Sequence, residues 1–129
     1  MGTDLNPEEM KAFVRRHFDD FVNNQRAEVI RENMAPDFLD HNGPGDRAVG
    51  IAEDEQMMLG MYERMPDIKV TIEDMVAEGD RVVCRNVWRW NDEGGNAMEF
   101  RGFVEWRFEG DKIAERWATV TSPQPVRPT

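Results

Sequence analysis

The residues best suited to chemistry are a histidine and an aspartate that stand next to each other. His41 follows Asp40 directly, Asp37 lies nearby, and the turn-rich segment Gly43-Pro44-Gly45 comes next. A carboxylate that hydrogen-bonds an imidazole can orient the ring and raise its basicity for proton transfer. The same pair can instead brace a turn, and the spacing leaves both interpretations open.

Two further polar side chains fall within apolar patterns. Asn86 stands in the middle of the apolar side of an expected strand. A buried amide must be hydrogen-bonded, either to a structural partner or to a group that enters a cavity. His17 lies on the apolar stripe of an expected helix, which favours a core histidine with one hydrogen bond.

Several common site motifs are absent from the chain. The two histidines and scattered carboxylates form no metal-binding spacing such as H-x-x-x-H or C-x-x-C. The sequence also has no G-x-S-x-G, no glycine-rich phosphate loop and no dinucleotide fingerprint. We therefore expect neither a metal nor a cofactor.

Composition excludes several kinds of partner. The 129 residues include 16 Lys and Arg against 26 Asp and Glu, a net charge of −10, which argues against nucleic acid and anionic membranes. Cys84 is the single cysteine, so no internal disulfide can form, as expected for a reducing cytoplasm. The N-terminus does not read as a signal peptide, and no apolar run approaches membrane-spanning length. We expect a soluble, cytoplasmic protein.

Three helices are expected in the first half of the chain. Asn6, Pro7 and Glu9 form a helix start, and an apolar stripe continues to about residue 23. A shorter helix is expected from about Ala27 to Met34, and a third from about Ile51 to Met65, where Pro66 follows.

The second half reads as antiparallel strands separated by acidic glycine turns. After a strand that begins near Ile68 and slips in phase at Asp74-Met75, three long strands span 81–90, 97–108 and 112–121. A sheet with one apolar face needs helices across it, so the fold class is α+β. We expect one domain over 1–129, with a core at 6–121 and a disordered proline-rich tail at 122–129.

The alternation of side chains assigns faces to two strands. In 81–90 the apolar side should face the helices, and in 97–108 the charged side should face solvent, where Phe103 suggests a contact surface. The last strand offers Glu115, Trp117, Thr119 and Thr121 on one side against Ala114, Ala118 and Val120 on the other. Pattern alone does not decide between them.

With these pieces in order, the chain resembles the SnoaL-like polyketide cyclase family of the nuclear-transport-factor-2-like superfamily, which has a cystatin-like α+β architecture. The resemblance covers roughly residues 7–121. It is carried by the segments Phe18–Asn23, Phe38–Asn42, Met65–Asp67, Ala77–Val83, Phe100–Gly102 and Trp106–Trp117.

The resemblance implies a cone-shaped, curved, mostly antiparallel sheet packed against three N-terminal helices around one apolar pocket. It also implies a homodimer joined through the sheets and cofactor-free intramolecular aldol chemistry, with His41 matching a family histidine. The position of the family's acid/base carboxylate is occupied by Thr121, and Asp92 is nearest to a second family histidine. Either Asp92 substitutes for that histidine or the aldol chemistry is absent or altered.

Three functions follow from this pattern. The first is a small-molecule enzyme, a cyclase, isomerase or hydrolase, that acts on a hydrophobic, polyketide-like ligand. The others are a non-catalytic binding module and a structural dimer with a filled pocket. The catalytic candidates are His41, Asp40, Asn86 and Asp92. The candidate pocket residues are His17, Phe21, Met58, Tyr62, Cys84, Trp88, Trp90, Phe100, Val104, Trp106, Trp117, Thr119 and Thr121.

Overall fold

The computed structural model describes residues 2–127. Its first helix, α1 (Pro7–Phe18), begins with the expected capping box, in which the Asn6 side chain accepts from the Glu9 backbone and Glu9 accepts from the Asn6 backbone. The chain continues through a π-helical turn, η1 (Asp19–Asn23). Two short helical segments follow, η2 (Ala27–Val29) and α2 (Ile30–Asn33).

One long helix and six strands make up most of the rest of the described residues. The second long helix is α3 (Ile51–Arg64), which follows the short 3-10 turn η3 (Pro44–Asp46). The strands are β1 (Met34–Asp40), β2 (Lys69–Glu78), β3 (Arg81–Asn91), β4 (Ala97–Glu109), β5 (Lys112–Val120) and β6 (Gln124–Pro125).

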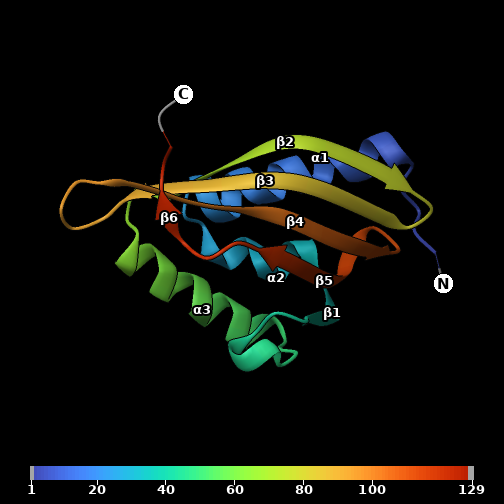
Figure 1. Cartoon of the computed structure of the whole chain (residues 1–129). Helices are drawn as coiled ribbons and strands as arrows, with labels where there is room; N and C mark the ends of the chain where they lie inside the picture. Colours follow the sequence, from blue (N-terminus) through green and yellow to red (C-terminus); the bar gives the residue numbers. More distant parts are fainter. Residues whose placement is uncertain (1, 128–129) are drawn as a thin grey trace.

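The strands form one sheet in the order β1-β5-β4-β3-β2, with β6 paired to β4. Strands β2 to β5 are antiparallel neighbours, whereas β1 runs parallel to β5. Figure 1 shows the long strands running side by side, with α1 behind β2 and β3 and with α3 nearer to β1. The fold is therefore α+β, with helices packed on a mostly antiparallel open sheet, as the sequence predicted.

The core lies between α1 and the inner face of the sheet. The helix buries Met10, Val14 and Phe18 on one stripe. The inner side of β3 meets this stripe, as expected from the alternation of the sequence. It is formed by the buried residues Val82, Cys84, Asn86, Trp88 and Trp90.

Two local features interrupt the regular pairing and packing of the sheet. The register of β2 against β3 shifts between Ile72 and Asp74, which confirms the predicted bulge. In β4, Gly102 lies so close to β5 that an added Cβ would collide with the Thr119 carbonyl. A residue without a side chain is required there.

Two segments differ from the sequence expectations. The segment Met34–Asp40 is a strand, and the short helix ends at Asn33 instead of continuing to Met34. The expectation of a disordered tail is wrong for 124–126. Gln124 and Pro125 pair with β4, and the Val126 N–H donates to the Ala97 carbonyl. Residues 128 and 129 lie outside the described residues.

Candidate functional site

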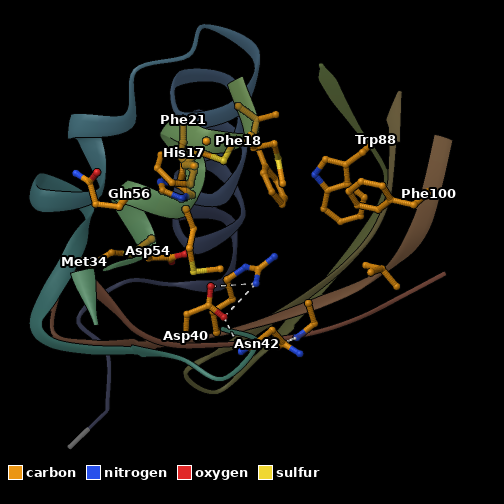
Figure 2. A pocket seen from close by; sticks show the side chains of 18 of the residues that line it. His17, Phe18, Phe21, Met34, Asp40, Asn42, Asp54, Gln56, Trp88 and Phe100 are labelled. Atoms are coloured by element: carbon orange, nitrogen blue, oxygen red, sulfur yellow. Dashed lines mark hydrogen bonds and ion pairs between the residues drawn. The ribbon is translucent and has the colours of Figure 1, made fainter. Parts of the chain in front are cut away.

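An apolar cavity of about 540 Å³ lies between α1, α3 and the inner face of the sheet. Figure 2 shows His17, Asp54 and Asp40 along one wall, with Trp88 and Phe100 on the opposite side. The polar lining residues are His17, Asp40, Asn42, Asp54, Gln56, Arg64 and Arg116, and the aromatic ones are Phe18, Phe21, Trp88, Phe100 and Trp106.

Asp40 and Arg116 form an ion pair at the cavity wall. Their backbones are paired in register between β1 and β5. Both carboxylate oxygens of Asp40 lie 3.2 Å from Arg116 Nη1, and Asp40 Oδ1 also accepts from the Asn42 N–H at 2.9 Å. Because Asp40 is only 3% exposed, this pairing compensates for the loss of hydration.

Asp54 brings a second carboxyl group to the same wall. It lies in the first turn of α3 and is 9% exposed. Burial, the charge of Asp40 and a hydrogen bond with Asp40 together raise the pKa of Asp54 to about 7, and the nearby Arg116 acts in the opposite direction. A pKa of about 7 means that both the acid and the carboxylate form of Asp54 are populated near neutral pH, as general acid/base catalysis requires.

The Trp106 ring contacts a charged side chain and a polar side chain. The Arg116 guanidinium lies 5.6 Å from its ring centroid, a cation–π distance. The His17 ring approaches it edge-on, with 5.5 Å between centroids. Trp106 is 1% exposed, so it fixes Arg116 and His17 at neighbouring positions of the wall.

Seven of the residues predicted from the sequence line the cavity. Asp40 is the only one of the four catalytic candidates among them. The others were predicted as pocket residues: His17, Phe21, Met58, Trp88, Phe100 and Trp106.

His41 lies outside the cavity, contrary to the expectation from sequence. Its ring stacks on Trp117, with 4.9 Å between centroids and 7° between planes. Its Nε2 lies 2.7 Å from Glu115 Oε2, and Glu115 also accepts from Arg107 Nε. Asp40 therefore does not orient His41, because its carboxylate is held by Arg116 on the inner side of the sheet.

Asn86 is fully buried but does not line the cavity. Its Nδ2 lies 3.4 Å from both the carbonyl oxygen and the Sγ of Cys84. Its Oδ1 is the one buried side-chain atom without a hydrogen-bond partner among the described residues. Asn86 thus belongs to the packed sheet face beside the cavity.

Asp92 is a turn residue. Its Oδ1 accepts hydrogen bonds from the backbone N–H groups of Gly94 and Asn96, each at 2.9 Å, in the hairpin between β3 and β4. These bonds lower the pKa of its carboxyl. Its position therefore gives no support to the alternative in which Asp92 takes the role of a family histidine.

The strand β5 presents its other side to the cavity. Arg116, Ala118 and Val120 line the cavity, so the alternation of the strand directs Trp117 and Thr119 to the outer face. Thr121 pairs instead with β4, where its Oγ1 accepts the Arg101 N–H at 3.0 Å. The expectation that Trp117, Thr119 and Thr121 line the pocket is therefore corrected.

Four other predicted pocket residues lie behind the lining. Cys84, Trp90 and Val104 are buried within the core. Tyr62 is directed to the helix layer, where its hydroxyl donates to the Phe21 carbonyl. They support the wall without forming its surface.

Sequence reasoning missed the two charged residues that complete the site, Asp54 and Arg116. Helical spacing places Asp54 on the same side of α3 as Met58 and Met61, and a carboxylate on an apolar stripe was a usable signal. Arg116 alternates with Ala114 and Ala118, so it was a guanidinium on an otherwise apolar side of the strand.

Within residues 2–127, no three His, Cys, Asp or Glu side chains are grouped as metal ligands. None of the helices in this part of the chain is long and apolar enough to cross a membrane.

The chain belongs to the SnoaL-like polyketide cyclase family, whose model matches residues 12–121. No curated protein sequence matches the chain.

Solved structures share the fold at low sequence identity. AclR from Streptomyces galilaeus, described as a candidate hydroxylase, is 22% identical with a TM-score of 0.78, over 90% of this chain and 91% of AclR. IdmH from Streptomyces antibioticus, a candidate polyketide cyclase, is 21% identical with a TM-score of 0.77, over 85% and 90%. A SnoaL-like polyketide cyclase from Agrobacterium tumefaciens is 17% identical with a TM-score of 0.70, over 84% and 88%. At these identities the likeness concerns the fold alone.

Proposed function

We propose that this protein is a small-molecule enzyme of the cyclase or isomerase type, which performs acid/base chemistry on an apolar ketone without a redox step. One observation carries the proposal. Two carboxyl groups, from Asp40 on β1 and Asp54 on α3, meet at the wall of an apolar cavity with the Arg116 guanidinium beside them. Membership in a family of polyketide cyclases is consistent with it.

The two carboxyl groups lie in different electrostatic environments and therefore have different roles in proton transfer. Asp40 forms an ion pair with Arg116, and its negative charge makes ionisation of Asp54 more difficult. A base whose pKa lies near the working pH is both present in its basic form and strong enough to remove a weakly acidic proton. Asp54 is therefore the proton carrier. Burial is the main cause of its raised pKa, the negative charge of Asp40 raises it further, and Arg116 lowers it.

For a cyclisation, the steps balance without any added reagent. Ionised Asp54 removes a proton from the carbon next to a carbonyl, and the electrons of the C–H bond form an enolate. The enolate carbon bonds to a second carbonyl carbon of the same molecule, whose oxygen becomes an alkoxide. The alkoxide then takes the proton back from Asp54, so the product has the atoms of the substrate. For an isomerisation, the proton returns instead to another carbon of the enolate system.

The cavity suits a flat, apolar substrate. Trp88 and Phe100 stack with 4.8 Å between centroids and 21° between planes, and both border the cavity. Such a surface binds fused or conjugated rings by apolar contact and offers few polar groups that would compete for the carbonyls.

Exchange of α-protons for deuterium in β-tetralone, a small bicyclic ketone, tests the proposal without the natural substrate. Wild-type protein should accelerate exchange above the buffer rate, and Asp54→Asn should lose most of that acceleration, at least about a hundredfold. His41→Phe is the matched control, since this ring lies outside the cavity. Equal rates in wild type and Asp54→Asn would refute the assigned role.

The alternative is a binding module with the same fold but no turnover. It is favoured by Thr121, because the hydroxyl at the family's carboxylate position is engaged with the backbone of β4. Tight binding of β-tetralone, measured by tryptophan fluorescence, with no exchange above buffer would support this reading.

A further inference from the structure

His17 has one ring nitrogen that is engaged and one that is free. Its Nδ1 lies 3.0 Å from Asn33 Nδ2. No hydrogen bond involves its Nε2 among the described residues. Among these residues, Asn86 Oδ1 is the only fully buried side-chain nitrogen or oxygen atom that lacks a hydrogen-bond partner, so the unbonded Nε2 of His17 is not fully buried. His17 lines the cavity, so we take Nε2 to be the ring nitrogen that faces it.

The contact with Asn33 favours one tautomer of the His17 ring. An amide NH₂ group is only a donor, so the Nδ1 that faces it must accept. In a neutral imidazole the single ring hydrogen then resides on Nε2. The helix α1 and the short helix α2 thus cooperate to direct an N–H group into the cavity.

The ring is also fixed in orientation. It stacks on Phe21, with 4.9 Å between centroids and 20° between planes, and its edge meets Trp106. The side chain is 1% exposed. A donor held in this manner does not need to reorganise when charge develops on a bound group.

The surroundings keep the ring neutral. Burial, with the positive charge of Arg116 as a smaller cause, lowers the pKa of His17 to about 3. Near neutral pH the ring therefore donates a hydrogen bond without supplying a charge or giving up a proton.

We propose that His17 is a carbonyl-binding residue, whose Nε2–H donates to the oxygen of the ketone from which the Asp54 carboxylate removes the α-proton. The inference rests on the proposed function for its reaction, but the hydrogen bond can be measured without turnover. As the C–H bond breaks, negative charge moves to the carbonyl oxygen, so the bond from His17 strengthens toward the transition state. His17 and Arg116 approach the same indole, which places this donor beside the carboxyl pair.

Two measurements test the inference. Nitrogen NMR of isotope-labelled wild type at about pH 7 should show His17 as the neutral Nε2–H tautomer. Infrared spectroscopy of bound β-tetralone, labelled at its carbonyl, should show a lower carbonyl stretching frequency in wild type than in His17→Phe, and His17→Gln should restore part of the shift through its amide N–H.

Binding affinity provides a third readout. Wild type should prefer β-tetralone over the isostere in which a methylene group replaces the carbonyl oxygen by about tenfold, the range of one hydrogen bond. His17→Phe should lose this preference while Asp54→Asn retains it. A merely structural role for His17 would change both affinities together.

Several outcomes would overturn the inference. They are an Nδ1–H tautomer, an imidazolium near pH 7, identical carbonyl frequencies in wild type and His17→Phe, or no binding of β-tetralone to wild type. If His17→Phe does not fold, the tautomer in wild type still decides. A carbonyl shift that depends on His17, with no α-proton exchange, would refute the proposed enzyme function and leave the donor in place.

Discussion

Replacing Asp54 with Asn should change how the stability of the protein depends on pH. The native state holds a proton on Asp54 up to about pH 7, whereas the unfolded chain releases it near its ordinary pKa of 3.8. Between these values the native state binds more protons, so this group makes the free energy of unfolding fall as pH rises. Above about pH 7 the carboxyl is ionised in both states. The decrease in the free energy of unfolding is then complete and no longer changes with pH.

The size of the effect follows from the two pKa values. A rise of the Asp54 pKa from 3.8 to about 7 corresponds to about 4 kcal/mol of free energy, because a pKa change of one is equivalent to about 1.4 kcal/mol. The asparagine side chain of the variant would carry no proton to lose and would keep an N–H donor for Asp40. The stability of the variant relative to wild type should therefore increase by up to about 4 kcal/mol between about pH 4 and pH 7 and stay level above that.

Urea unfolding followed by tryptophan fluorescence across this pH range measures the difference. Glu63→Gln, an exposed acidic residue of the same helix, is the control for removal of one carboxylate. A stability difference between Asp54→Asn and wild type that stays constant from pH 4 to pH 8 would show that Asp54 holds no proton at neutral pH.

Three further predictions concern other parts of the molecule. Gly102→Ala should cost about 1–3 kcal/mol in urea unfolding, because its methyl group would collide with the Thr119 carbonyl; an unchanged midpoint would refute the close approach. His41→Phe should leave the affinity for β-tetralone within about twofold of wild type, since the ring stacks on Trp117 outside the cavity. A large loss of affinity in fluorescence titration would show that His41 contributes to the binding site. Phe103 is 54% exposed on the outer face, and a homodimer joined through the sheets would cover it, so Phe103→Glu should produce monomers in analytical ultracentrifugation. Sedimentation identical to wild type would count against that arrangement.

The sequence was most informative where structure depends on neighbours in the chain. The capping box at Asn6 and the glycine turns between strands are local signals, and both gave elements close to the observed ones. The strand β1 was missed as a strand because it contains Pro36 and pairs in parallel with β5, about 80 residues further along the chain. Its pairing is a property of the sheet as a whole.

The site was predicted only in part, for a similar reason. The aromatic wall followed from strand alternation, which placed Trp88, Phe100 and Trp106 correctly. Adjacency in sequence suggested that Asp40 acts on His41, but a strand directs successive side chains to opposite faces, so the two separate. The true partners of Asp40 come from α3 and β5, and such distant contacts are not encoded in local spacing.

The cavity is assembled from two halves of different character. The sheet half consists of rigid aromatic rings held in register by strand pairing, whereas α3 contributes Met57, Met58 and Met61, which are flexible and unbranched. Substitutions in α3 alone would therefore change the size and shape of the ligand that the cavity accepts. A library confined to the α3 methionines, with Asp54 held constant, would test this, with Met58 restricted to apolar residues because it also belongs to the core.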